Sequence, residues 1–90
     1  MKVTVEYAAQ VKRATGVASE DLELPDDCSL TELARTVAET HGTEVARVLL
    51  DDGGLHKSIL IFVDDEQVRD GDTKLSDGHR VTFLSPISGG

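Results

Sequence analysis

The residues that point most clearly to a chemical role stand at the end of the sequence, where Gly89 and Gly90 follow Pro86, Ile87 and Ser88. Glycine has no Cβ atom, so two consecutive glycines can pass through a channel that is too narrow for other residues. We therefore expect the terminal carboxylate of Gly90 to be the reactive group, placed in the active site of another protein. A loose chain end without a function is the alternative reading of Gly-Gly alone.

The residues before the glycines set where this tail starts. Leu84 is typical of the end of a strand, and Pro86 has no N–H for a sheet and restricts Ser85 to extended conformations. Strand pairing is therefore expected to stop at Ser85. We divide the chain into one domain at residues 1–84 and a flexible C-terminal tail at residues 85–90.

Other side chains with reactive potential are isolated in the sequence. His41, His56 and His79 lack the spacing of a metal site, so no metal is expected. Cys28 is more typical of a small buried residue than of a nucleophile, although a position near a helix N-terminus can lower a thiol pKa. There is no nucleophile elbow and no phosphate-binding glycine loop. The sequence thus favours a substrate or carrier over an enzyme.

The composition narrows the class of partner. Seventeen acidic residues against nine basic ones give a formal net charge of −8, which disfavours nucleic acid as a partner. An acidic surface suits partners with basic docking patches, and general solubility explains the same charge equally well. No apolar run approaches the roughly 20 residues that cross a bilayer. With a single cysteine and no signal peptide, we expect a cytoplasmic protein without a membrane partner.

The first half of the sequence predicts two strands and two helices. Residues 1–9 and 19–24 alternate in polarity, as half-buried strands do, and residues 10–18 are expected to connect them as a hairpin. A capping box at residues 29–32 begins a helix with one apolar stripe, which ends near His41 with Gly42 as a left-handed cap. A short second helix is then expected, capped by Thr43, running through Leu50 and burying Val45, Val48 and Leu49.

The second half predicts the remaining strands. Residues 51–54 are read as a loop, and the apolar, β-branched run at 59–63 as a strand with cover on much of both faces. Residues 67–68 suggest a short edge strand, and residues 80–84 the last strand, with Val81 and Phe83 facing the core. This order predicts an α+β fold of the β-grasp (ubiquitin-like) type: a mixed sheet of about five strands, one main helix packed on one face and a short second helix.

The segment from Phe62 to Gly90 resembles the MoaD/ThiS family of ubiquitin-like sulfur carriers. Seven positions match the family pattern in order and spacing: Leu75, Asp77, Gly78, Val81, Pro86, Gly89 and Gly90. His79 stands where an acidic residue is usual, and Asp65 where glycine is common. These departures leave the subfamily open and do not touch the tail.

The resemblance implies a role for the tail. An adenylating enzyme of the MoeB/ThiF type would activate the Gly90 carboxylate with ATP, and a sulfurtransferase or sulfide would convert it to a thiocarboxylate. Gly89, Ser88, Ile87 and Pro86 would be the segment that enters partners. The protein itself would bind no cofactor, since ATP is used by the activating partner. An acceptor such as a MoaE-type synthase subunit would receive the sulfur, and molybdopterin, cysteine, thiamine and tRNA thiolation all stay open as pathways.

A second candidate surface lies on the sheet. Leu84, together with Phe62 or Ile61, would lie on the sheet face away from the helix, either as a docking surface or as ordinary strand packing.

The alternative function is a ubiquitin-like modifier joined through Gly90 to target lysines. A β-grasp interaction module with an incidental diglycine is the third hypothesis.

Overall fold

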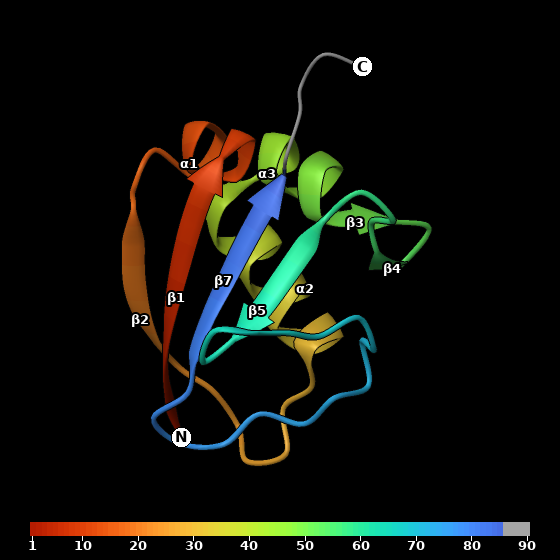
Figure 1. The fold of residues 1–90 in the computed structure, drawn as a ribbon. Helices are drawn as coiled ribbons and strands as arrows, with labels where there is room; N and C mark the ends of the chain where they lie inside the picture. Colours follow the sequence, from red (N-terminus) through yellow and green to blue (C-terminus); the bar gives the residue numbers. More distant parts are fainter. Residues whose placement is uncertain (86–90) are drawn as a thin grey trace.

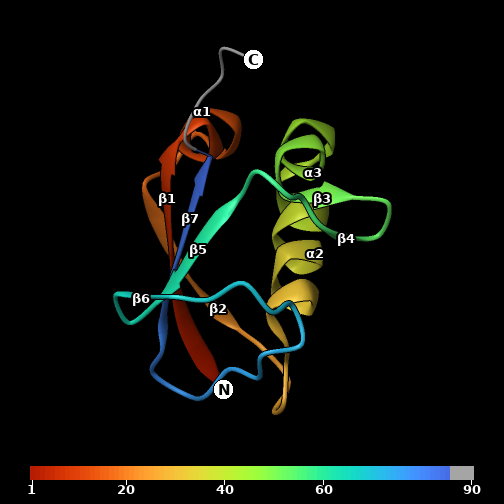
Figure 2. The same ribbon diagram turned by 45° about the vertical axis from the view of Figure 1, so that its right-hand side comes forward.

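The computed structural model describes residues 1–85 and shows a mixed five-stranded sheet with the strand order β2-β1-β7-β5-β6. The two longer helices lie on one face of this sheet, and a short one lies where β1 and β7 finish (Figures 1 and 2). The elements are β1 (Lys2–Ala9), α1 (Gln10–Thr15), β2 (Ser19–Glu23), α2 (Leu30–His41), α3 (Thr43–Leu49), β3 (Leu50–Asp51), β4 (Gly54–Leu55), β5 (Leu60–Val63), β6 (Glu66–Gln67) and β7 (Arg80–Ser85). The predicted β-grasp fold is confirmed.

The sheet is built around one parallel pair. β1 runs antiparallel to β2 and parallel to β7, and β7 runs antiparallel to β5. The α2 helix lies in the long crossing connection from β2, on one side of this pair, to β5, on the other. β7, the last strand in the sequence, therefore lies in the middle of the sheet.

Alternation along the strands divides the sheet into a core face and an outer face. Val81 and Phe83 of β7 are fully buried, as predicted, while Thr82 and Leu84, which alternate with them, are partly exposed. The core face packs against the apolar stripe of α2, which consists of Leu30, Leu33, Ala34, Val37 and Ala38.

The capping box of α2 is present as predicted. The Ser29 hydroxyl accepts the Glu32 N–H at 3.2 Å, and the Glu32 carboxylate accepts the Ser29 N–H at 3.0 Å. The prediction for Gly42 is wrong: its φ of 105° and ψ of −168° lie outside the left-handed helical region. Because α3 starts at the next residue, the chain must change direction between the helices, and Gly42, not Thr43, is the N-cap of α3.

One helix and one hairpin were not predicted from the sequence. Residues 10–18 contain α1 rather than a plain hairpin connection; this helix buries only Val11, and Gly16 closes it in the left-handed conformation with φ 81°. The predicted loop at residues 51–54 is the turn of the β3–β4 hairpin, in which Asp52 and Gly53 both have positive φ. Both elements are too short for a periodic pattern to reveal them.

The other element predictions hold with small shifts. α3 buries Val45 and Leu49 as expected, whereas Val48 is only partly buried against the core. The short edge strand falls at Glu66–Gln67, one residue earlier than predicted. In β5, only Ile61 is buried, so this strand has less cover on its outer face than its apolar sequence suggested.

Candidate functional site

The start of the tail is fixed by the central strand of the sheet. Ser85 is 7% exposed and lies opposite Ala9 of β1, and Leu84 lies opposite both Ala8 of β1 and Leu60 of β5. β7 thus includes Ser85, one residue past the predicted domain boundary at residue 84. The predicted tail residues Pro86, Ile87, Ser88, Gly89 and Gly90 lie outside the described residues.

An apolar surface lies on the outer face of the sheet beside this point. We define the outer-face patch as four partly exposed residues: Leu84, its register partners Ala8 and Leu60, and Phe62, which lies two residues after Leu60 on the same face of β5. The predicted placement of Leu84 and Phe62 follows from their alternation with buried neighbours. Ile61, offered as the alternative to Phe62, is only 2% exposed and belongs to the core, so that part of the prediction is wrong. Leu60 and Ala8 were missed, although the two-residue spacing from Phe62 pointed to Leu60.

The opposite end of the outer face is polar. Arg80 contacts the Asp65 carboxylate at 2.8 Å and the Glu6 carboxylate at 3.7 Å, and these acidic neighbours raise the pKa of its guanidinium. The Thr82 hydroxyl donates to Glu6 at 3.3 Å. The outer face is therefore apolar next to the tail and charged at its far end, the arrangement of an apolar contact area with a polar rim.

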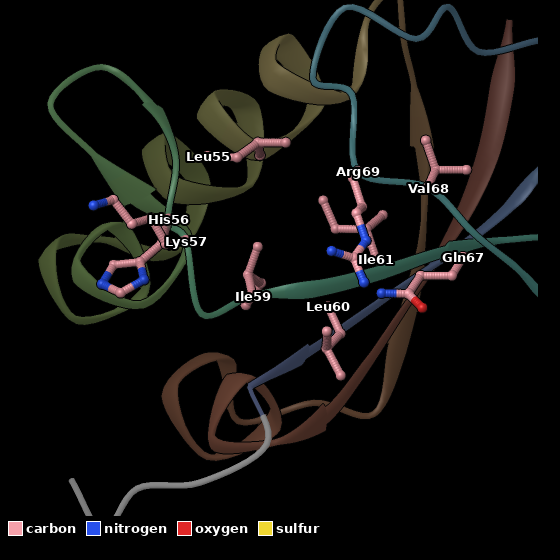
Figure 3. A pocket seen from close by; sticks show the side chains of 9 residues that line it. All are labelled: Leu55, His56, Lys57, Ile59, Leu60, Ile61, Gln67, Val68 and Arg69. Atoms are coloured by element: carbon pink, nitrogen blue, oxygen red, sulfur yellow. The ribbon is translucent and has the colours of Figure 1, made fainter.

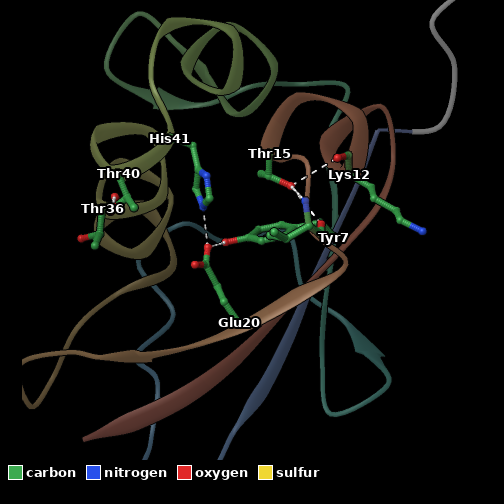
Figure 4. Close-up of polar contacts among 8 residues, drawn as sticks. Tyr7, Lys12, Thr15, Glu20, Thr36, Thr40 and His41 are labelled. Atoms are coloured by element: carbon green, nitrogen blue, oxygen red, sulfur yellow. Dashed lines mark hydrogen bonds and ion pairs between the residues drawn. The ribbon is translucent and has the colours of Figure 1, made fainter.

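A hydrogen-bonded cluster joins β1, β2 and α2 on the other side of the sheet (Figure 4). The Tyr7 hydroxyl donates to the Glu20 carboxylate, and Nε2 of His41 lies 2.6 Å from the same carboxylate oxygen. Burial raises the pKa of the Tyr7 hydroxyl, and so does the adjoining carboxylate. Burial alone would also raise the pKa of Glu20, but the hydrogen bonds from Tyr7 and His41 outweigh it and lower that pKa.

This cluster serves the fold rather than chemistry at the tail. Its three side chains hold the edge strand β2 to the C-terminal end of α2, and Tyr7 is only 4% exposed. Alternation along β1 puts Tyr7 on the same face as Val3 and Val5, and His41 ends α2, but their common partner Glu20 comes from another strand. Local spacing carries no signal for such a contact.

The remaining candidate side chains form no reactive group. Cys28 is 4% exposed, and burial raises the pKa of its thiol, so the position before α2 does not acidify it. Within residues 1–85, no three His, Cys, Asp or Glu side chains come together in a way that could hold a metal ion. In the same part of the chain, no helix has the length and apolar character to cross a membrane.

The fold and the position of its last strand define a ubiquitin-like β-grasp protein. The sequence model of the ThiS family matches residues 5–90, and the chain belongs to this family. No curated protein sequence matches the chain significantly.

Solved structures agree with this assignment. SAMP1 from Haloferax volcanii has a TM-score of 0.83 at 20% identity, with all of both chains covered, and shows the same fold. A candidate subunit 1 of the molybdopterin converting factor from Pyrococcus furiosus has a TM-score of 0.75 at 26% identity, covering 97% of this chain and 99% of that one. CysO from Amycolatopsis orientalis, solved in complex with BexX, has a TM-score of 0.73 at 28% identity, covering 98% and 99%.

Proposed function

We propose that this protein carries sulfur as a thiocarboxylate on Gly90. The observation that carries the proposal is the ThiS family match, which extends through residue 90 and so includes the diglycine. The fold is consistent with it, because the central strand β7 leads directly into the tail, opposite Ala9.

The chemistry follows from the low reactivity of a carboxylate. The Gly90 carboxylate attacks the α-phosphate of ATP in an adenylating partner, which forms an acyl adenylate and releases pyrophosphate. Sulfide then displaces AMP and leaves sulfur in place of one carboxylate oxygen. Where the sulfur comes from the persulfide of a sulfurtransferase, its terminal sulfur displaces AMP to give an acyl disulfide, and a second thiol of the partner cleaves that S–S bond, forms a disulfide with the sulfurtransferase and releases the thiocarboxylate. Catalysis belongs to the partners in this scheme, and the role of the chain is to present Gly89 and Gly90 in a narrow segment.

The outer-face patch is the surface that we assign to docking. It lies beside the strand that carries the tail, so a partner that binds Phe62 and Leu84 can receive the tail in the same encounter. The relatives support the idea of a protein partner, since CysO was solved in a complex with BexX. We assign the acceptor of the sulfur only by class, as a biosynthetic enzyme with a channel for the tail, such as a MoaE-type subunit.

A reconstitution with the adenylating enzyme of the same host tests this proposal. With ATP and sulfide, the wild-type chain is expected to gain a thiocarboxylate, and variants that lack Gly90 or carry Gly89→Ala are expected to lose this activity at least about tenfold. Gly54→Ala is the matched control, because a Cβ atom at Gly54 meets no atom within 4 Å. Full thiocarboxylation of the Gly89→Ala variant would remove the narrow-channel argument, and sulfur transfer by the variant without Gly90 would refute the proposal.

A modifier function is the second candidate, and the similarity to SAMP1, the small archaeal modifier protein 1 of Haloferax volcanii, favours it. It begins from the same adenylate, which a lysine amine attacks in place of sulfur. The expected product is a branched peptide with Gly90 on a target lysine. Native-host extracts that contain no such peptide would count against this second function and leave the first intact.

A further inference from the structure

The structure contains a second candidate binding site, which adjoins the outer-face patch at Leu60. It is a pocket of about 220 Å³ at the edge of the sheet, where β6 separates from β5. Figure 3 shows His56 and Lys57 on one side of this pocket, Gln67, Val68 and Arg69 on the other, and β5 between them. We call it the β5-edge pocket.

The backbone of β5 is only partly paired along this pocket. The hydrogen bond from Asp64 N–H to the Arg80 carbonyl fixes the alternation, so the even-numbered residues of β5 direct their backbone groups at β7. The odd-numbered residues, Ile59 and Ile61, direct theirs at the pocket side. There the Ile61 carbonyl accepts the Val68 N–H at 2.9 Å, but within residues 1–85 neither the Ile61 N–H nor the Ile59 carbonyl has a backbone partner.

These two groups have the arrangement that an added strand requires. The Ile61 donor in β5 and the Ile59 acceptor, one residue before β5, are two residues apart, which is the repeat of a sheet ladder. An exposed strand edge of this kind is a template for pairing with another chain. As whole residues, Ile59 and Ile61 are 8% and 2% exposed, so the segment that carries these two backbone groups is held firmly by the core.

The charge around the pocket indicates which kind of partner would bind there. Lys57 and Arg69 are exposed, no carboxylate lines the pocket, and neither cation makes an ion pair with another residue of 1–85. This is a basic site in a chain whose formal net charge is −8. The apolar part of the lining, including Leu55 and Val68, suits an aliphatic side chain between acidic ones.

We propose that the β5-edge pocket binds an extended acidic peptide segment of a partner protein. The segment pairs its backbone with the Ile61 N–H and the Ile59 carbonyl, places an aliphatic side chain in the pocket and directs carboxylates at Lys57 and Arg69. This site does not use the tail, so it provides a contact that is separate from sulfur transfer.

An NMR titration of the full-length, ¹⁵N-labelled protein tests the proposal. The probe is a blocked peptide with a central valine-isoleucine-valine, flanked by two aspartates on each side. Saturable shifts are expected at the amides of Ile61 and Val68, and K57E/R69E is expected to weaken binding at least about tenfold by like-charge repulsion. The matched control K12E/R13E changes two exposed cations of α1 and should bind as the wild type does, as should the variant without Gly90.

Further probes separate strand addition from other modes of binding. The same peptide with methylated amides in its central part cannot pair with Ile59 and Ile61, so we expect it not to bind. Equal binding of that peptide, equal binding of a lysine-flanked peptide, or shifts confined to the outer-face patch would overturn the proposal. Shifts of the Ile61 amide that depend on protein concentration without any peptide would also overturn it, because the occupant would then be a second copy of this chain.

Discussion

Ser85, the last residue of β7, lies opposite Ala9, the last residue of β1, and the two parallel strands end at this pair. Ala9 has φ 56° and ψ −128°, a combination typical of glycine, and it turns the chain from β1 into α1. The chain therefore enters the tail and enters α1 at the same end of the sheet.

The first prediction concerns the backbone conformation of Ala9. Ala9→Gly relieves a strained conformation and is expected to raise the free energy of unfolding by about 1 kcal/mol, since such strain amounts to about 1–3 kcal/mol and part is offset by backbone entropy. Ala8→Gly is the matched control: Ala8 lies within the strand, so the same change there should destabilise by about 0.5–1 kcal/mol. Urea denaturation measures both, and a destabilised Ala9→Gly variant would show that this turn is unstrained.

The second prediction concerns binding through the outer-face patch. Phe62→Asp and Leu84→Asp place a charge in the apolar contact area and are expected to weaken binding to the adenylating enzyme at least about tenfold. Val17→Asp is the control, because Val17 is 40% exposed and lies in the connection between α1 and β2. Calorimetry with the purified partner gives the dissociation constants, and unchanged affinity in both patch variants would assign docking to another surface.

The third prediction concerns the N-terminal cap of α2. Ser29→Ala removes the hydroxyl that accepts the Glu32 N–H, and it is expected to lower the free energy of unfolding by about 1 kcal/mol. Thr36→Ala within the same helix should have little effect or stabilise slightly, because alanine has the higher helix propensity. Thermal and urea denaturation compare the two variants; an equal effect of both would mean that the cap contributes nothing specific.

The fourth prediction concerns the Tyr7–Glu20–His41 cluster and the pH dependence of stability. The pKa of Glu20 is lower in the folded state, so its carboxylate contributes stability above the ordinary pKa of about 4.5, and this contribution is lost as pH falls through the lowered value. Glu20→Gln should therefore be less stable than the wild type near neutral pH, and the difference should shrink in acid. Glu23→Gln, an exposed change on the same strand, is the control, and a pH-independent difference for Glu20→Gln would contradict this account.

The fold could be predicted from the sequence where a pattern repeats over several residues. Alternation gave β1 and β7, and the capping box with its apolar stripe gave α2, because the periods of 2 and 3.6 reflect burial on one side. α1 was missed because six residues with a single buried side chain make no stripe. Gly16 was read as part of a hairpin connection, whereas it caps α1.

The site was predictable only in part, for a different reason. Leu84 could be placed because it alternates with the predicted core residues of β7, but whether Phe62 or Ile61 faces outward was left open, since the run in β5 is apolar throughout and only its pairing with β7 decides it. Glu20 and the free edge of β5 depend on contacts between segments that are far apart in the sequence. Such contacts become visible only when the chain has folded.

The most direct measurement is mass spectrometry of the C-terminal peptide of the protein purified from its own host. The account predicts that a fraction of the molecules carries sulfur in place of one oxygen at Gly90. The mass change must be localised to this peptide, because oxidation of Met1 gives nearly the same shift. A peptide that ends in an ordinary carboxylate, and that stays so after incubation with the host's adenylating enzyme, ATP and sulfide, would contradict the sulfur-carrier function.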